Sequence, residues 1–374
     1  MYRAYLPIIL ILVFGLSPKF SAQDFDTNVI TIDGTITSMD WQPDGETLTV
    51  GGDKSIWFVN KDKTVLHHEF ESVIDIAWHP SENSIAALYS NKVKIYDVSN
   101  WNIELEIPTD YDEGVYLYEL MVSEPNPLFW SNDGNYITLI PQLRDTDLVV
   151  WDAQNGDEVF ALEYLDDRIL GVSWHPNLPY LAVGYINGRI DVWDITTQTM
   201  IYSFNKHSYS VAAISWNPKS KFVASAGIQL GGCGVGSLDG NSVFIWSTTN
   251  HELRHTLRTN QCSYTNPIAW NDDGSVLAFT TQSGGKQSDT YNTSIKLFDL
   301  ALGEIKNQVT ISENEASFVS ELHWQPETNN LTYRKRLVMD DDNLTCVRQT
   351  IGILDNVGQE IIRLEATGRI CGEI

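Results

Sequence analysis

Hydrophobic and polar positions alternate in three short runs within 168–198. The first run ends at Trp174 and the second covers 180–185. The third follows Asn187-Gly188 and ends at Trp193-Asp194. A period of two predicts β-strands, and Asn-Gly between two such runs is typical of a hairpin turn. The stretch therefore predicts a three-stranded antiparallel meander, which must pack on other sheets to bury its hydrophobic face.

The same unit occurs seven times along the chain, which predicts a repeat protein. The first run of each copy ends in a tryptophan and a turn, at Trp41, Trp78, Trp130, Trp174, Trp216, Trp270 and Trp324. The third runs end at 59–60, 96–97, 151–152, 193–194, 246–247, 298–299 and 354–355. A fourth run follows each of them, at 64–69, 103–107, 158–163, 200–204, 252–257, 304–309 and 360–364. We expect the seven tryptophans to pack in the core or between units, whereas Trp57 and Trp101 fall outside this register and are candidates for exposure.

The repeats resemble the WD40 family over about 35–364. Trp151-Asp152 and Trp193-Asp194 carry the pair that names the family, and Tyr96-Asp97 and Phe298-Asp299 are its common variants. The resemblance implies an all-β fold, a seven-bladed β-propeller of four-stranded antiparallel blades. The chain departs from the family in the Gly-His pair that precedes the first strand, because only His207 lies near that place. We therefore expect the buried hydrogen-bond network of that histidine to be mostly absent.

The two ends of the chain complete the predicted organisation. Arg3, the apolar stretch 6–16 and the small residues before position 23 are typical of a secretory signal peptide over 1–22. The alternative is an uncleaved anchor, although the apolar stretch is short for a membrane span. Residues 23–374 are then a single propeller in an extracytoplasmic location, either secreted or periplasmic or at the cell surface. We expect ring closure to bring 28–33 beside blade seven, whose fourth strand near Glu360 competes for the outer edge.

Four cysteines are present, at Cys233, Cys262, Cys346 and Cys371. An even number behind a signal peptide favours disulfides, and four cysteines allow three pairings. The blade assignment places Cys233 and Cys346 between the second and third strands of blades five and seven, and Cys262 and Cys371 after the fourth strands. Those connections emerge on one face, which predicts the pairs Cys233–Cys262 and Cys346–Cys371. The alternative is four buried or free thiols.

The charge balance narrows the classes of partner. The chain has 24 Lys and Arg against 49 Asp and Glu, a net charge of −25. Nucleic-acid binding requires clustered basic residues, so we predict no nucleic-acid partner. Adhesion to an anionic membrane is disfavoured for the same reason, and no stable membrane insertion is expected after signal cleavage. The charge suits a protein kept dispersed by self-repulsion, or one with a cationic partner. The oligomeric state stays open.

Three segments look like chemical motifs, and each has a simpler interpretation. His251 to His255 matches the zinc-protease pattern HExxH, but that pattern needs a helix and here it falls on a strand. Residues four apart on a strand are about 13 Å apart, too far to share one Zn²⁺. The glycine-rich stretch 231–236 lacks the lysine and helix of a phosphate loop, and the acidic stretch 340–343 lacks the glycine and distal glutamate of a calcium loop. We predict no metal site, no cofactor and no catalytic residue.

Two functional classes fit the sequence. The first is a non-enzymatic platform for protein–protein interaction, which the WD40 resemblance also implies. The second is an extracytoplasmic propeller enzyme, or a small-ligand or carbohydrate binder, with acids, His or Arg gathered at the mouth of the central channel. The middle loops of blades five to seven, 229–241, 282–293 and 340–345, are longer than those of the earlier blades and are predicted to project from one face. As candidate binding residues there we name Gly234, Ser237, Asp239, Ser283, Lys286, Tyr291, Asp341 and Asn343.

Overall fold

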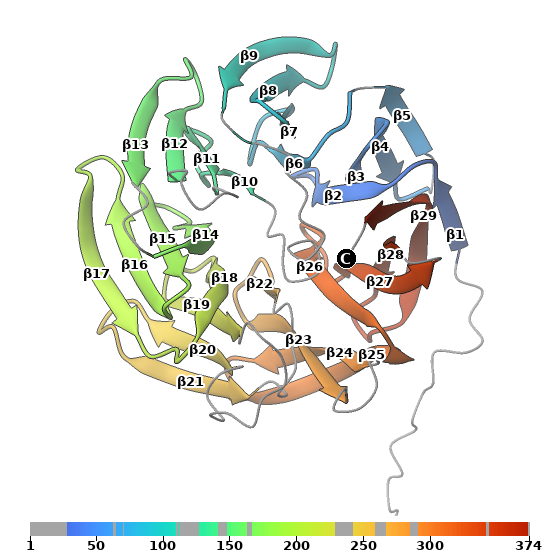
Figure 1. Cartoon of the computed structure of the whole chain (residues 1–374). Coiled ribbons are helices and arrows are strands. Elements are labelled where there is room, and N and C mark those ends of the chain that lie inside the picture. Colours follow the sequence, from blue (N-terminus) through green and yellow to red (C-terminus); the bar gives the residue numbers. More distant parts are fainter. Residues whose placement is uncertain are drawn as a thin grey trace, which may run out of the picture.

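The computed structural model describes residues 28–62, 65–69, 71–109, 111, 127–140, 148–162, 167–228, 242–258, 267–284, 291–341 and 344–372. These residues form 29 strands and no helix, so no described segment is a helix able to cross a membrane. The strands make seven sheets arranged as blades around one axis (Figure 1). The predicted seven-bladed propeller is confirmed.

Each blade contains four antiparallel strands in chain order, with the first strand nearest the axis (Figure 1). Blades one and two comprise β2 (Ile36–Trp41), β3 (Thr47–Gly52), β4 (Ser55–Asn60), β5 (Val65–Glu69), β6 (Asp75–Trp78), β7 (Ser84–Tyr89), β8 (Lys92–Asp97) and β9 (Asn102–Pro108). Blades three and four comprise β10 (Leu128–Trp130), β11 (Tyr136–Leu139), β12 (Leu148–Asp152), β13 (Glu158–Leu162), β14 (Ile169–Trp174), β15 (Tyr180–Tyr185), β16 (Arg189–Asp194) and β17 (Thr199–Asn205). Blade five comprises β18 (Ser210–Trp216), β19 (Phe222–Ile228), β20 (Ser242–Ser247) and β21 (Leu253–Arg258).

Blades six and seven have longer strands than the rest of the ring. They comprise β22 (Ile268–Trp270), β23 (Val276–Gly284), β24 (Tyr291–Asp299), β25 (Glu304–Glu315), β26 (Ser317–Trp324), β27 (Leu331–Asp341), β28 (Leu344–Leu354) and β29 (Glu360–Gly372). Much of 282–293 and 340–345 is therefore strand, where the polar composition predicted loops. Gln282 and Thr293 are buried, and both donate hydrogen bonds to the carbonyl of Ser317, at 3.1 and 3.0 Å. In blade six, Gln282 and Thr293 can lie in strands because their side chains bond to β26 of the next blade.

The N-terminal strand β1 (Asn28–Ile32) lies beside blade seven, as predicted. It pairs in parallel with β29 and becomes a fifth, outermost strand, so it does not compete with β29 for a place (Figure 1). Ile32 is fully buried in a cluster that also contains Ile36 of blade one and Ile362 of blade seven. The start and the end of the chain thus share one core.

The seven repeat tryptophans link neighbouring blades, as expected. Each indole N–H donates a hydrogen bond of 2.8 to 3.2 Å to the preceding blade. Trp41 of blade one donates to Thr332 of blade seven, which closes the ring. The expected exposure of Trp57 is wrong, because this side chain is 5% exposed and packs in the core shared by blades seven and one.

His207 anchors a buried hydrogen-bond network in blade five. Its Nε2 lies 2.8 Å from the hydroxyl of Ser225, which also accepts the indole N–H of Trp246 at 2.9 Å. Burial lowers the pKa of His207 to about 3, so the ring is neutral.

Candidate functional site

The predicted binding residues fall in two groups. Gly234, Ser237, Asp239, Lys286 and Asn343 lie outside the described residues. Ser283, Tyr291 and Asp341 belong to strands β23, β24 and β27. Within this group, β23 and β24 pair to the end of their hairpin, where Gly284 is opposite Tyr291, and β27 and β28 pair to Asp341 opposite Leu344. The two hairpin ends belong to adjacent blades and point to the same face of the ring.

The cysteines are only partly described. Cys346 is buried and disulfide-bonded, and its direct cross-strand neighbour is Cys371. Both residues lie inside long strands, β28 and β29, and not in the connections where the sequence placed them. Cys233 and Cys262 lie outside the described residues.

The two histidines of the HExxH segment point toward different blades. His251 stacks on Tyr202 of blade four, with ring centroids 4.1 Å apart, whereas His255 meets Phe298 of blade six edge-on at 5.1 Å. Within the described part of the chain, no group of three or more His, Cys, Asp or Glu is placed to hold a metal ion.

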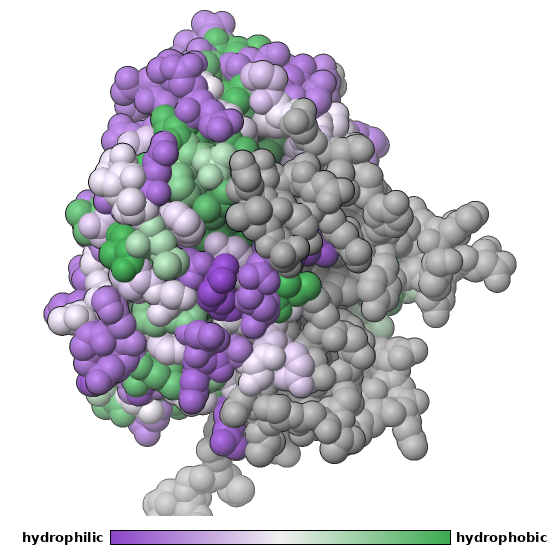
Figure 2. All heavy atoms as spheres, turned by 60° about the vertical axis from the view of Figure 1, so that its left-hand side comes forward, coloured by the Kyte–Doolittle hydropathy of each residue, from purple (hydrophilic) through white to green (hydrophobic). Residues whose placement is uncertain are grey.

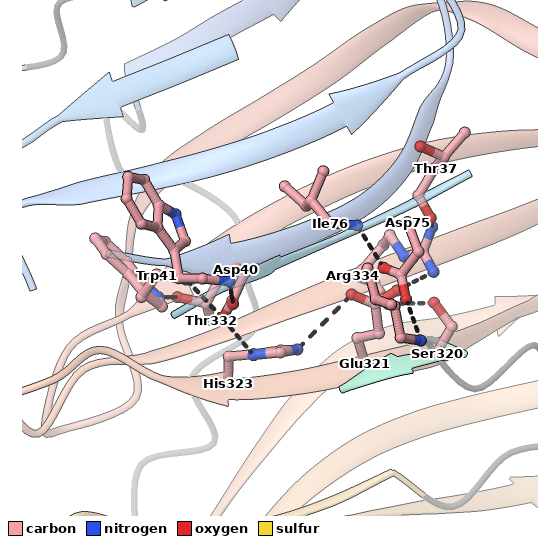
Figure 3. A network of polar contacts seen from close by, with 12 residues as sticks. Thr37, Asp40, Trp41, Asp75, Ile76, Ser320, Glu321, His323, Thr332 and Arg334 are labelled. Atoms are coloured by element: carbon pink, nitrogen blue, oxygen red, sulfur yellow. Dashed lines mark hydrogen bonds and ion pairs between the residues drawn. The ribbon is translucent and has the colours of Figure 1, made fainter. Parts of the chain in front are cut away.

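A network of charged side chains spans the inner strands of blades seven, one and two (Figure 3). It contains Asp40 on β2, Asp75 on β6, Glu321 and His323 on β26, and Arg334 on β27. Asp75, Glu321 and Arg334 are almost completely buried, whereas Asp40 and His323 keep about a quarter of their side-chain surface in solvent. The cluster of acids, His and Arg that an enzyme or ligand site would need is therefore present near the ring axis.

The two aspartates connect consecutive blades through backbone hydrogen bonds. Asp40 accepts the N–H of Trp78 in blade two at 2.8 Å, and Asp75 accepts the N–H of Leu128 in blade three at 3.0 Å. Burial raises the pKa of Asp75 to about 7, against the opposing effects of its two backbone N–H donors and of Arg334. Both carboxylates thus serve as fixed acceptors between blades.

Arg334 and His323 connect blade seven to blade one (Figure 3). The guanidinium of Arg334 forms an ion pair with Glu321 and donates a hydrogen bond to the carbonyl of Thr37. His323 lies between two carboxylates, with Nδ1 3.6 Å from Asp40 and Nε2 3.9 Å from Glu321. A buried ion pair is costly unless its groups are well paired. Arg334 and Glu321 pair within blade seven, while the contacts of Arg334 with Thr37 and of His323 with Asp40 cross the seam where the ring closes.

The network was missed at the sequence level, although it leaves a signal. Arg334 and Arg336 stand two apart on a strand that is second in its blade, so both side chains face the same packed layer. Charges on such a buried face require partners. Because Asp40, Asp75 and Arg334 each have contacts between blades, we assign the network to the joining of blades seven, one, two and three.

Comparisons with known proteins relate this propeller to WD-repeat proteins. A model of the "Anaphase-promoting complex subunit 4 WD40 domain" matches residues 129–219, and a model of the "WD domain, G-beta repeat" matches 27–60 and 198–247. Together with the seven-bladed ring, these matches support a WD40 propeller.

Relatives of this chain include "WD repeat-containing protein slp1" of Schizosaccharomyces pombe, 28% identical over 208 residues. "Anaphase-promoting complex subunit cdc20" of Dictyostelium discoideum is 27% identical over 213 residues. Each of these matches covers 55% of this chain and only 36% of the relative. "THO complex subunit 3" of Arabidopsis thaliana is 22% identical over 293 residues, 76% of this chain and 83% of the relative.

These relatives correct one expectation. They include a subunit of the anaphase-promoting complex and a subunit of the THO complex, which are intracellular proteins. The predicted extracytoplasmic location is therefore wrong on this comparison. The predicted signal peptide, 1–22, lies outside the described residues.

Proposed function

We propose that this chain is a non-enzymatic platform for protein–protein interaction. The observation that carries the proposal is the similarity of the propeller to WD-repeat proteins, two of which are named as subunits of multiprotein complexes. A ring whose blades are joined by seven tryptophan hydrogen bonds is a rigid support, and loops on a rigid support are where binding usually occurs. The partner is a protein or a peptide.

The surface of the ring is compatible with this role. On the side that carries β13 and β17, Figure 2 shows hydrophobic residues in separate areas among hydrophilic ones. Such a mixed surface is common to folded proteins, and interfaces that form and dissociate have a similar share of apolar area. Within this proposal, the hairpin ends of blades five to seven are one contact surface, at Gly234, Ser237, Asp239, Ser283, Lys286, Tyr291, Asp341 and Asn343.

Affinity capture tests the platform directly. The full chain is used as bait in a lysate of its own cells, and each captured protein is purified and mixed with the chain to test for a stoichiometric complex by size-exclusion chromatography. We expect at least one complex that survives the column. If no captured protein forms one, the proposal is wrong.

A shortened variant tests the hairpin surface. Replacing 285–290 by Asn-Gly keeps β23 and β24 intact and closes them with a two-residue turn. We expect this variant to keep the thermal midpoint of the wild type and to bind the partner more weakly. Unchanged affinity would exclude this hairpin as the contact while leaving the platform itself in place.

A further inference from the structure

The turns between the third and fourth strands differ in one sector of the ring. In blades two to five their tips are polar, with Ser99 and Asn100, Gln154 and Asn155, Thr196 and Thr197, and Thr249 and Asn250. Blade six instead has Ala301 and Leu302, and blade seven has Val357. Leu302 is 67% exposed and Val357 is 69% exposed, the two highest values among the exposed large hydrophobic residues of the described chain.

The geometry of both apolar tips is fixed by an aspartate. Asp299 accepts the backbone N–H groups of Ala301 and Leu302, each at 3.0 Å, and Asp355 accepts those of Val357 and Gln359, at 3.0 and 2.8 Å. Aspartate is favoured at such turns because its side chain bonds to the backbone two or three residues later. The side chains of Leu302 and Val357 are therefore held in solvent by ordered turns, where they contribute little burial to folding.

The two tips belong to adjacent blades, and the tip of blade seven is bonded to the outer strand of blade six. The side-chain amide of Asn307 on β25 donates a hydrogen bond of 3.3 Å to the carbonyl of Val357. Leu302 precedes Asn307 by five residues, a span of about 17 Å at most along a strand. One partner segment of roughly six extended residues is long enough to contact both tips.

The charges around the tips are mainly negative. The turns of blades six and seven on this face carry Asp272, Asp273, Asp299, Glu327 and Asp355, and the first residues of the outer strands beside them add Glu304 and Glu360 against Lys306 and Arg363. Exposed apolar residues beside one sign of charge fit a ligand that is apolar in the centre and opposite in charge at its ends.

We propose that Leu302 and Val357 form a docking surface, the tip surface, for a segment of a partner protein that carries apolar side chains flanked by Lys or Arg. This inference rests on the proposed platform function. It places a contact on the face opposite to the hairpin ends, because the third-to-fourth turns and the second-to-third hairpins lie at opposite ends of the strands.

The test uses two double variants of the full chain. Leu302→Asn with Val357→Thr gives the tips the polar residues of the other blades, so both turns are expected to fold. Ile103→Thr with Met200→Thr is the matched control, because Ile103 and Met200 are exposed by 50% and 51% on the outer strands of blades two and four. Both variants should keep the thermal midpoint of the wild type within a few degrees.

A phage library of random dodecapeptides is selected on the wild-type chain, and the dissociation constants of the enriched peptides are measured by fluorescence anisotropy. We expect peptides with two or three apolar residues flanked by Lys or Arg. Their dissociation constants should rise at least tenfold in the tip variant, stay within twofold in the control, and increase with salt because the charges are exposed. Absence of enrichment, acidic peptides, or equal weakening in both variants would overturn the inference.

Two further outcomes separate this inference from the function it rests on. If the partner found by affinity capture binds the tip variant with unchanged affinity, the tip surface is wrong and the platform stands. If the wild-type chain sediments as a dimer and the tip variant as a monomer, a second copy occupies the surface, which contradicts the proposed basic partner.

Discussion

At the scale of single residues, one position on the preceding blade determines where each repeat tryptophan donates its N–H. In the second strand of every blade, one residue pairs directly with that blade's own repeat tryptophan. The determining position is the next residue along this second strand. Where it is threonine, at Thr49, Thr138 and Thr332, the indole donates to the threonine hydroxyl. Where it is alanine, at Ala86, Ala182, Ala224 and Ala278, the indole donates to a carbonyl of the inner strand. A small side chain therefore leaves the indole free to reach the backbone.

This rule predicts an unusual order of stabilities at Thr138. Thr138→Val keeps the volume but removes the acceptor, so the buried N–H of Trp174 loses a partner at a cost of roughly 1–3 kcal/mol. Thr138→Ala allows the indole to adopt the arrangement of the alanine blades and should cost less. Urea unfolding of the two variants measures the difference. If Thr138→Val destabilises less than Thr138→Ala, the volume of the side chain determines the stability at this position and the rule is wrong.

Asp75 and His207 make opposite contributions to the pH dependence of stability. The folded pKa of Asp75, about 7, exceeds its ordinary value of 3.8, so its stabilising effect is present at low pH and is lost as pH rises through 7. The folded pKa of His207, about 3, is below its ordinary value of 6.5, so its effect is present above pH 6.5 and is lost as pH falls toward 3. Between about pH 4 and 6.5 the two contributions partly cancel.

Asp75→Asn should reveal this cancellation. Relative to wild type, the free energy of unfolding of the variant should increase as pH rises from 4 to 7, by on the order of 4 kcal/mol at most. A constant offset is also expected, because the amide nitrogen cannot accept one of the two backbone N–H groups that Asp75 accepts. His207→Gln is the matched control and should give the opposite slope. Parallel curves for Asp75→Asn and wild type would exclude a raised pKa.

At the scale of the strand, the repeat was predictable because each first strand ends in a tryptophan that is followed directly by turn residues. The extension of β23, β24, β27 and β28 was not predictable, because Gln, Ser, Thr and Asp are typical of loops. Their strand conformation depends on contacts with other strands, such as that between Gln282 and Ser317. For such polar segments, contacts with strands that are distant in the sequence determine whether the conformation is strand or loop.

The charged network at the candidate site could not be predicted from the sequence for the same reason. Charges at Arg334 and Glu321 can be read from the sequence, but their meeting requires the register that pairs Arg334 directly with Glu321 across β26 and β27. Asp40 and Asp75 reach the next blade only after consecutive blades have packed together. By contrast, the apolar tips at Leu302 and Val357 can be found by aligning the seven turns, once the blades are known.

The disulfide prediction also belongs to the scale of the strand. Cys346 is bonded, and Cys371 is its direct neighbour on β29, so we predict the pair Cys346–Cys371. We predict Cys233–Cys262 as the second pair. Peptide mapping without reductant tests both, with alkylation before digestion to prevent exchange. Recovery of Cys346 linked to Cys233 or Cys262 would contradict the assignment.

At the scale of the whole molecule, the ring is closed by several independent contacts between blades seven and one. Trp41 donates to Thr332, and Gln325 donates to the carbonyl of Gly45 at 2.7 Å. Arg334 bonds to Thr37, and the backbone of Gly368 bonds to that of Gly34. Strand β1 adds to a blade that already has four strands of its own. The added strand is therefore expected to stabilise the seam without being required for closure.

Ile32→Ala tests this arrangement of the seam. Ile32 is fully buried between β29 and blade one, so the truncation should cost roughly 2–4 kcal/mol. Val29→Ala on the same strand is the control, since Val29 is 53% exposed and should cost much less. Because the other seam contacts remain, hydrogen exchange should accelerate in β1 and β29 while β14 to β17 keep their protection. Equal acceleration in all seven blades would show instead that the ring opens as one cooperative unit when β1 is weakened.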